Sequence, residues 1–258
     1  MRFTEPAFLT YLLAQRRFQE PILEVGAGWT PDYHLKPFAA LGYTDFLTQD
    51  VVAYPHHPLA TFVCDVCDLA PIQTGAIGTV LCFNVLEHCY APWLAVKAVR
   101  RVLAPGGVVV GSVPMRAAIH RHSRDYWRFC PDGIAELLRE FRLDTFAIEG
   151  NPESPANLLF AAESDPSRED WLEHNEAVTA APLVITDTDY LTDNPIKKAL
   201  VRLVRHFGYD LGLWTRHNDK RRMQELGYEQ WRLVPRAAEW PSAQEQRPVT
   251  HLPNRTRA

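Results

Sequence analysis

The feature that most constrains the fold of this chain is an alternation of short apolar runs with segments of helical periodicity. The apolar runs predict strands at 22–26, 44–48, 61–64, 78–83, 107–113, 142–149 and 156–162. The periodic segments predict helices at 5–18, 33–41, 91–103 and 131–141. Strands that alternate with helices form mostly parallel sheets covered on both faces. We therefore predict an α/β fold, a Rossmann-like, doubly wound, mostly parallel seven-stranded sheet with helices on both faces.

The pattern changes after about residue 163, which predicts a second region. We interpret 1–163 as one domain and 164–234 as a C-terminal helical extension that serves as a lid or as the surface of a homodimer. Within this extension, helical periodicity is found at 168–180, 195–207 and 218–226. The last residues, 235–258, are rich in proline, arginine and polar residues, which predicts a poorly ordered tail.

The composition argues against several classes of function. The formal net charge of −4 gives no electrostatic basis for nucleic acid as the main partner. No segment approaches the roughly 18 apolar residues that cross a bilayer. The N-terminus carries Glu5 and lacks the apolar core of a signal peptide. We therefore expect a cytoplasmic protein with no membrane span.

The cysteines predict reduced thiols rather than a disulfide framework or a metal site. The five cysteines form no even set and lie in or near predicted strands. Cys64 and Cys67 have the CxxC spacing of zinc and redox sites, but no second pair follows at a suitable spacing. We therefore predict that the chain binds no metal.

The first predicted strand ends in a glycine turn, Glu24-Val25-Gly26-Ala27-Gly28. A glycine has no Cβ, so the backbone can adopt a positive φ and a ligand can approach it closely. Sheets of this class bind ligands at the carboxyl ends of their strands, where the strand order reverses. An acid at this place, Glu24, suits a cationic ligand better than a pyrophosphate.

Two other interpretations of the glycine turn are open. A dinucleotide site requires a third glycine, and Pro31 stands at that position, followed by Asp32, which would repel a pyrophosphate. A module that binds NAD or a nucleotide sugar is therefore a weaker hypothesis. The turn could also connect two elements without binding any ligand.

Acidic and polar residues follow the later predicted strands as well. Asp50 comes after the second strand, and Cys64-Asp65-Val66-Cys67 follows the third. The fourth strand ends in Phe83-Asn84-Val85-Leu86-Glu87-His88. In this order, and together with the glycine turn, these segments resemble the class I S-adenosylmethionine-dependent methyltransferases, and among them the branch that acts on small molecules. The resemblance covers about residues 20–163.

The resemblance implies S-adenosyl-L-methionine as the cofactor. In the family, the glycine turn carries the methionine part, and the acid before it helps to recognise the amino end. An acid after the second strand binds the ribose hydroxyls, for which Asp45 competes with Asp50. The segment after the third strand binds adenine, and the segment after the fourth lies beside the methionine. The predicted cofactor residues are Glu24, Gly26, Ala27, Gly28, Asp50, Asp65, Val66, Asn84 and Val85.

The loop after the fifth predicted strand is our hypothesis for the substrate site. It concentrates basic and aromatic residues, and loops in this position overhang the cofactor. We predict that the acceptor contacts Asp125, Tyr126, Trp127 and Arg128. The alternative is that Asp125 and Arg128 tie the loop down while the two aromatic residues cover the sheet.

Three histidines are candidates for a general base, in the order His120, His122 and His88. A histidine titrates near neutral pH and can accept a proton from the acceptor group. For His88 there is a structural alternative, because the corresponding histidine in this branch often orients the loop through a hydrogen bond.

The resemblance therefore implies a methyltransferase of class EC 2.1.1. We expect the acceptor to be an oxygen or nitrogen atom of a small molecule, a sugar or a glycan precursor. Enzymes that methylate amino groups of DNA and protein often carry a Pro-Pro-Tyr motif at the position that corresponds to the residues after Asn84. This chain has Val85-Leu86-Glu87 there instead. The alternative hypothesis is a catalytically inactive, methyltransferase-like partner protein that binds the cofactor.

Overall fold

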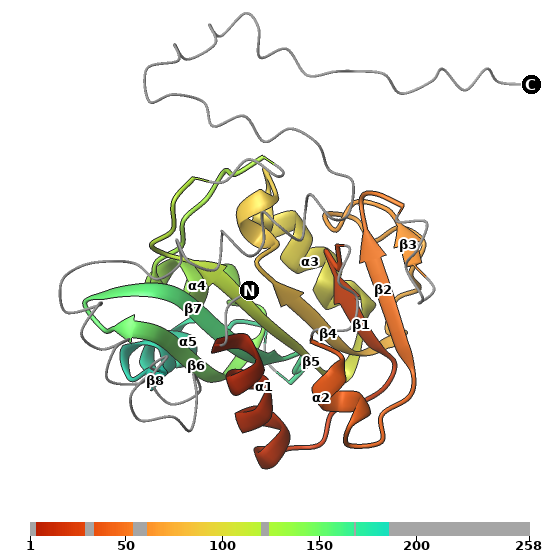
Figure 1. Cartoon of the computed structure of the whole chain (residues 1–258), viewed down its shortest axis with the longest axis horizontal. Helices are drawn as coiled ribbons and strands as arrows, with labels where there is room; N and C mark the ends of the chain where they lie inside the picture. Colours follow the sequence, from red (N-terminus) through yellow and green to blue (C-terminus); the bar gives the residue numbers. More distant parts are fainter. Residues whose placement is uncertain (1–3, 29–33, 54–60, 120–123, 168, 186–258) are drawn as a thin grey trace, which may run out of the picture. The chain divides into compact units, whose positions relative to one another are not determined.

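The computed structural model describes residues 4–28, 34–53, 61–119, 124–167 and 169–185 (Figure 1). These residues form one eight-stranded sheet in the order β3-β2-β1-β4-β5-β7-β6-β8. The strands are β1 (Ile22–Val25), β2 (Phe46–Asp50), β3 (Thr61–Val63), β4 (Ile77–Phe83), β5 (Leu103–Pro114), β6 (Arg142–Asn151), β7 (Ser154–Glu163) and β8 (Leu183–Ile185). The helices are α1 (Thr4–Gln15), α2 (Lys36–Ala39), α3 (Pro92–Val102), α4 (Pro131–Leu137) and α5 (Leu172–Ala180), with a 3-10 turn, η1 (Leu86–His88).

The strand pairing confirms the predicted fold class. The strands from β3 to β5 along the sheet are parallel to one another, and β7 is antiparallel to both β5 and β6. The strand order reverses between β1 and β4, since β2 and β3 continue on one side of β1 and β5 continues beyond β4. The crevice at the carboxyl ends of β1 and β4 is therefore the expected ligand position for this class of sheet.

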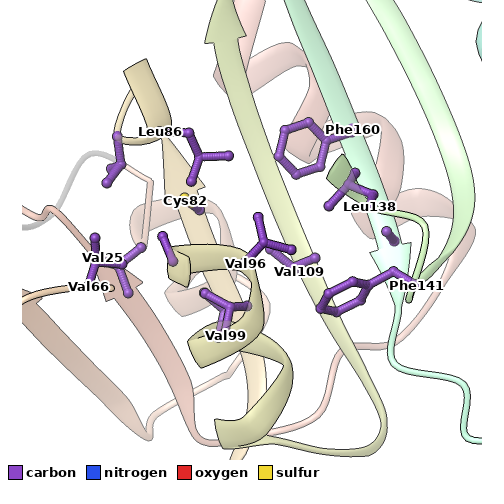
Figure 2. Close-up of a cluster of buried hydrophobic side chains, with 14 of the residues drawn as sticks. Val25, Val66, Cys82, Leu86, Val96, Val99, Val109, Leu138, Phe141 and Phe160 are labelled. Carbon is purple, nitrogen blue, oxygen red and sulfur yellow. The ribbon is translucent and has the colours of Figure 1, made fainter. Parts of the chain in front are cut away.

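Both faces of the sheet are buried, because alternate residues of its central strands point to opposite sides. Phe8 and Leu9 of α1 pack with Leu81 of β4 on one face. On the other face, the valines of α3 pack against the strands, and Figure 2 shows Val96 and Val99 beside Cys82 and Val109. Burying helices on both faces leaves the carboxyl edge of the sheet as the place for a ligand.

The sheet contains one strand more than the seven that we predicted, because β8 pairs in parallel with β6. Its three residues are too short to show a periodic pattern. The helix α5 precedes it and contacts α4 and β6. The buried side chain of Asn175 fastens α5, since its oxygen accepts from Leu143 N and its amide donates to Leu138 O and Phe141 O.

The described part of the expected extension, 164–185, is thus one helix and one edge strand attached to the sheet. The helices expected at 195–207 and 218–226, and the tail at 235–258, lie outside the described residues. The domain boundaries, the lid and the homodimer surface therefore remain predictions.

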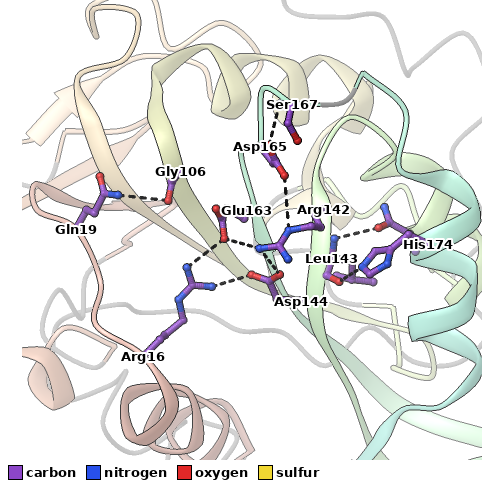
Figure 3. Close-up of polar contacts among 11 residues, drawn as sticks. Arg16, Gln19, Gly106, Arg142, Leu143, Asp144, Glu163, Asp165, Ser167 and His174 are labelled. Atoms are coloured by element: carbon purple, nitrogen blue, oxygen red, sulfur yellow. Dashed lines mark hydrogen bonds and ion pairs between the residues drawn. The ribbon is translucent and has the colours of Figure 1, made fainter.

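A group of ion pairs holds the end of α1 against the antiparallel part of the sheet (Figure 3). Arg16 Nη1 lies 2.7 Å from Asp144 Oδ2, and Arg16 Nη2 lies 3.5 Å from Glu163 Oε2. Arg142 pairs with the same two carboxylates, at 3.2 Å and 2.9 Å. Together with the apolar contacts of Phe8 and Leu9, these pairs fix where α1 lies on the sheet.

In the described parts of the chain, no helix is long and apolar enough to cross a membrane.

Candidate active site

The glycine turn after β1 brings the loop after β4 close to the end of β1. Gly26 and Gly28 have φ angles of +61° and +62°, in the left-handed region that glycine tolerates best. A Cβ atom on Gly26 would lie only 2.6 Å from Val85 Cγ2. A glycine is therefore required at residue 26 for two independent reasons, its backbone conformation and the contact with Val85.

Gln49 supports this turn, a role that the sequence analysis did not assign to it. Its side-chain oxygen accepts a hydrogen bond from Gly26 N at 3.3 Å, and its amide donates to Cys64 O at 2.6 Å. Its backbone oxygen accepts from Ala27 N at 3.1 Å. The sequence offered only one signal for this role, a polar residue directly before the predicted ligand Asp50. The burial of Gln49, which makes its hydrogen bonds important, is known only from the structure.

Asp50 lies at the carboxyl end of β2, beside the glycine turn. Its two carboxylate oxygens accept from Gly28 N at 2.9 Å and from Val52 N at 3.1 Å. The competing candidate, Asp45, is exposed and precedes β2, so it lies at the opposite end of the strand. Of the two acids, Asp50 is therefore the one at the carboxyl end of β2, where parallel sheets of this class bind ligands.

Glu24 is buried and pairs with His34, which the sequence analysis did not single out. His34 Nδ1 donates to Glu24 Oε1 at 2.6 Å, and His34 Nε2 lies 3.4 Å from Glu5 Oε2 of α1. Burial lowers the pKa of His34, but hydrogen bonds and the charges of the two carboxylates raise it to about 9. The imidazole is therefore protonated at neutral pH and stacks on Phe83 with ring centroids 4.3 Å apart.

Asn84 occupies the turn directly after β4. Its φ of +53° is uncommon for a residue with a side chain, although asparagine tolerates it better than most. Its backbone N donates to Ser112 O at 2.9 Å, and its side-chain amide donates to Glu5 Oε1. Val85, the next residue, is buried against the glycine turn. Asn84 and Val85 therefore lie at the carboxyl end of β4 beside the glycine turn, where the crevice of a doubly wound sheet is expected.

The segment after β3 separates into an exposed acid and a buried wall. Asp65 is exposed, and its Oδ1 accepts from Cys67 N at 2.8 Å, whereas Val66 belongs to the apolar core. Burial, with the neighbouring acids, raises the pKa of Cys67 to about 11, so its thiol is protonated at neutral pH. Among the described residues no group of His, Cys, Asp and Glu is arranged to hold a metal ion.

The four predicted substrate residues divide into two pairs with different surroundings. Asp125 and Arg128 form a bidentate ion pair, with Nη2 2.6 Å from Oδ2, and only 3 % of the Asp125 side chain is exposed. Arg128 also donates to the backbone oxygens of Ala117 and Trp127. These contacts are those of the structural alternative, in which the ion pair ties the loop down.

The aromatic residues of this loop remain exposed and contact the loop after β4. Tyr126 N donates to Glu87 O at 2.8 Å, and Trp127 Nε1 donates to Cys89 O at 2.8 Å. The ring of Trp127 meets that of Trp93, at the start of α3, edge to face with centroids 6.2 Å apart. We call Trp93 and Trp127 the tryptophan pair. Trp93 was not predicted, because nothing in the sequence places α3 beside the loop after β5.

His88 orients the loop after β5 through its ring. Its Nδ1 donates to Arg124 O at 2.7 Å, and its Nε2 lies 3.8 Å from Glu87 Oε1. Since a carbonyl oxygen can only accept, the proton on Nδ1 is committed to this bond. The other two candidates for a base, His120 and His122, lie outside the described residues.

Residues 24–111 match the family model of a methyltransferase domain. Among solved structures, the chain is similar to the Burkholderia thailandensis 1,6-didemethyltoxoflavin-N1-methyltransferase, whose structure contains 1,6-didemethyltoxoflavin and S-adenosylhomocysteine. The two are 21 % identical over 63 % of this chain and 77 % of that chain, with a TM-score of 0.50. At this identity the likeness concerns the fold alone.

Two further solved structures are similar at lower scores. One is the Haloferax volcanii putative methyltransferase in complex with the activator Trm112, at 17 % identity over 62 % of this chain and 90 % of that chain, with a TM-score of 0.47. The other is the CurJ carbon methyltransferase, at 14 % identity over 62 % of this chain and 54 % of that chain, with a TM-score of 0.48. No curated protein is significantly similar to the chain in sequence.

The matched domain begins at Glu24, contains the glycine turn and ends within β5. Its mostly parallel strands and the reversal of strand order between β1 and β4 belong to the doubly wound fold class that the sequence predicted. The resemblance stated from the sequence is therefore confirmed. Residues 24–111 thus match a methyltransferase domain, and the sheet around them has the fold of a solved S-adenosylhomocysteine-bound methyltransferase.

Proposed function

We propose that this protein is an enzyme that binds S-adenosyl-L-methionine and transfers its methyl group to an oxygen or nitrogen atom of a small molecule, a sugar or a glycan precursor. The observation that carries the proposal is the meeting of Glu24, Asp50 and the Gly26–Gly28 turn at the carboxyl edge of the sheet. Two carboxylates beside an open glycine turn suit a ligand with a ribose and a cationic end.

Two features of the residues at this edge support the binding of such a cofactor. Among the described residues, a Cβ on Gly28 would have only Gly26 O near it, at 4.0 Å, which supports close approach of a ligand to the backbone there. Each oxygen of Asp50 accepts one backbone hydrogen bond, and a carboxylate oxygen can accept a second. Asp50 would thus bind the two ribose hydroxyls, and Glu24 and Asn84 would face the methionine end.

The bound cofactor supplies a methyl group on a positively charged sulfur that departs readily. The protein has to hold the acceptor in line with that methyl group and exclude water, and positioning of this kind can account for about 7–11 kcal/mol of the barrier. A base is needed only where the acceptor must lose a proton. We retain His120 and His122 for that role and place His88 in the orienting role, because its Nδ1 holds Arg124 O.

The tryptophan pair supports an acceptor that contains a ring. Trp93 is 54 % exposed and Trp127 is 38 % exposed, so both present apolar surface to solvent. Surface aromatic residues that are held by hydrogen bonds are typical of binding sites. We therefore propose that the acceptor contacts Tyr126 and Trp127, as expected from the sequence, and also Trp93. Asp125 and Arg128 would hold this surface in place.

We also propose that the protein acts in the cytoplasm. All five cysteines are free, including the pair with CxxC spacing. Free thiols are typical of proteins in a reducing compartment.

Calorimetric titration with S-adenosylhomocysteine tests the proposal. The wild type should bind one equivalent, and Asp50→Asn should weaken binding about tenfold or more, because two charge-assisted hydrogen bonds are lost. Asp45→Asn is the matched control, since Asp45 lies at the other end of β2 and should leave the affinity unchanged. Absence of binding to the wild type would overturn the proposal. Binding without turnover across a panel of acceptors would instead select the inactive partner protein.

A further inference from the structure

A buried chain of polar contacts connects α1 to both strands that border the cofactor crevice. Glu5 of α1 lies at its centre and is only 4 % exposed. One of its oxygens, Oε1, accepts from Ser112 Oγ of β5 at 2.8 Å and from the side-chain amide of Asn84. The other, Oε2, lies 3.4 Å from His34 Nε2, and His34 Nδ1 donates to Glu24 at the end of β1.

The charges of this chain of contacts are unusual for a protein interior. Burial raises the pKa of Glu5, but the hydrogen bond and charge of His34, with hydrogen bonds from Ser112 and Asn84, bring it below its ordinary value. His34 is protonated, as described above. Counted over these three described side chains alone, with both carboxylates ionised, Glu5, His34 and Glu24 carry one net negative charge. Such a group is costly to bury unless each member has partners, and here it extends through three sheet strands and α1.

The position of the group indicates that it serves the ligand site. Both ends of the chain of contacts, Glu24 and Asn84, are residues that border the crevice between β1 and β4. These contacts are not formed between neighbours in the sequence, since Glu5 and Asn84 are 79 positions apart. Glu5 also precedes the matched domain, which begins at Glu24. The helix α1 therefore inserts a carboxylate between the two motifs that would hold the methionine end.

We propose that His34 and Glu5 are positioning residues of the cofactor site, which makes α1 part of that site. His34 fixes the carboxylate of Glu24, and Glu5 fixes the side chain of Asn84. Glu5 also leaves the group with one net negative charge, which favours the cationic sulfonium cofactor over its demethylated, less positive product. This inference rests on the proposed function and assigns two residues that the sequence motifs do not contain.

The net charge makes the two residues separable by experiment. Glu5→Gln keeps the size of the side chain and removes its charge, so the sum of the group rises from −1 to 0. His34→Gln keeps a side chain that can donate one hydrogen bond and removes the positive charge, so the sum falls from −1 to −2. A residue with a merely structural role would change the binding of both ligands in the same proportion. A charge effect instead changes the ratio of the affinity for S-adenosylmethionine to that for S-adenosylhomocysteine. This ratio changes in opposite directions in the two variants, because one loses a negative charge and the other a positive charge.

The test is calorimetric titration of wild type, Glu5→Gln and His34→Gln with S-adenosylmethionine and S-adenosylhomocysteine at pH 8. Glu5→Gln should lower the preference for S-adenosylmethionine about three- to tenfold, and His34→Gln should not lower it. Both variants should bind S-adenosylhomocysteine more weakly, because Asn84 or Glu24 loses a charged partner and is held less firmly. His174→Gln is the control, since His174 of α5 contacts Leu143 O of β6 and the change should leave both affinities unchanged.

A measurement on the protein without ligand accompanies the titration. The ring signal of His34 in NMR spectra, identified by its absence in His34→Gln, should titrate near the pKa of about 9 in the wild type. In Glu5→Gln the pKa should fall toward its ordinary value, because one of the two carboxylates has lost its charge. If Glu5→Gln does not fold, two measurements still test the inference. They are the NMR titration of His34 in the wild type and the ratio of the two ligand affinities in His34→Gln.

The outcomes separate this inference from the proposed function. A wild type that binds neither ligand overturns the proposed function, and the inference with it. A wild type that binds both, with folded variants whose affinities and ligand ratio match the wild type, overturns the inference alone. A wild-type His34 signal that titrates near pH 6.5 would also overturn it, because the imidazolium bridge would then be absent at neutral pH.

Discussion

Two regions at the carboxyl edge of the sheet differ in how far apart in the sequence the partners of their ionised side chains lie. In the loop after β5, Asp125 pairs with Arg128, three positions away. In the crevice between β1 and β4, Glu5 reaches Ser112 across 107 positions and Asn84 across 79. The first region stabilises its own loop, whereas the second depends on the whole sheet and α1. The difference predicts that changes in the crevice will affect both folding and ligand binding, and that changes in the loop will act locally.

The largest effect should come from the glycine turn. We expect Gly26→Ala to destabilise the protein by about 3 kcal/mol, because a positive φ and a clash with Val85 add together. Cofactor binding should be lost. Gly42→Ala is the matched control, since Gly42 has a φ of +87° but no atom of the described residues within 4 Å of a Cβ. We expect it to cost about 1 kcal/mol in urea unfolding. Equal costs for the two variants would show that Val85 does not constrain the turn.

The second effect concerns the pH dependence of stability in the crevice. The pKa of His34 is raised in the folded state to about 9. A raised pKa stabilises the fold fully at pH values below about 6.5, the value of unfolded histidine, and this stabilisation is lost as the pH rises to about 9. The contribution is roughly 3 kcal/mol by the free energy per pKa unit.

Urea unfolding of wild type and His34→Gln at pH 6 and pH 9.5 measures this contribution. The stability difference between the two proteins should be large at pH 6 and small at pH 9.5. A difference that stays constant with pH would mean that His34 contributes through packing on Phe83 rather than through its charge.

The third effect tests whether the Asp125–Arg128 pair acts only on its own loop. We expect Asp125→Ala to destabilise the protein by about 2 kcal/mol, because it leaves the Arg128 guanidinium without its carboxylate partner. The double variant with Arg128→Ala should lose less than the sum of the single variants, in a double-mutant cycle of urea unfolding. The affinity for S-adenosylhomocysteine should stay unchanged in all three variants. A loss of affinity would show that the loop and the crevice are coupled.

The smallest effect should be that of Trp127→Phe. This change removes the hydrogen bond to Cys89 O and keeps most of the ring, so we expect a loss of about 1 kcal/mol. Acceptor KM should rise while the affinity for S-adenosylhomocysteine stays constant. Trp171→Phe, next to α5 and beside His174, is the control for the loss of a tryptophan. An unchanged KM in Trp127→Phe would remove the tryptophan pair from the acceptor site.

The sequence alone was sufficient for the fold class and for the order of the motifs. Each of the seven predicted strands corresponds to a strand of the structure, because apolar runs and glycine turns are local signals. It was not sufficient for β8, whose three residues join the sheet only because β6 offers a free edge. The sequence was also not sufficient to place Asp45 and Asp50, which the strand bounds put at opposite ends of β2.

What the sequence determined by itself is therefore what depends on neighbouring residues: strands, helices, the glycine turn and the family to which they belong. Tertiary structure alone decided which distant side chains meet. Gln49 under the turn, Trp93 beside Trp127, and Glu5 and His34 around Glu24 are single polar or aromatic residues without a local pattern. Their roles arise because a sheet brings the ends of separate strands together, and only there do their charges and hydrogen bonds act on one another.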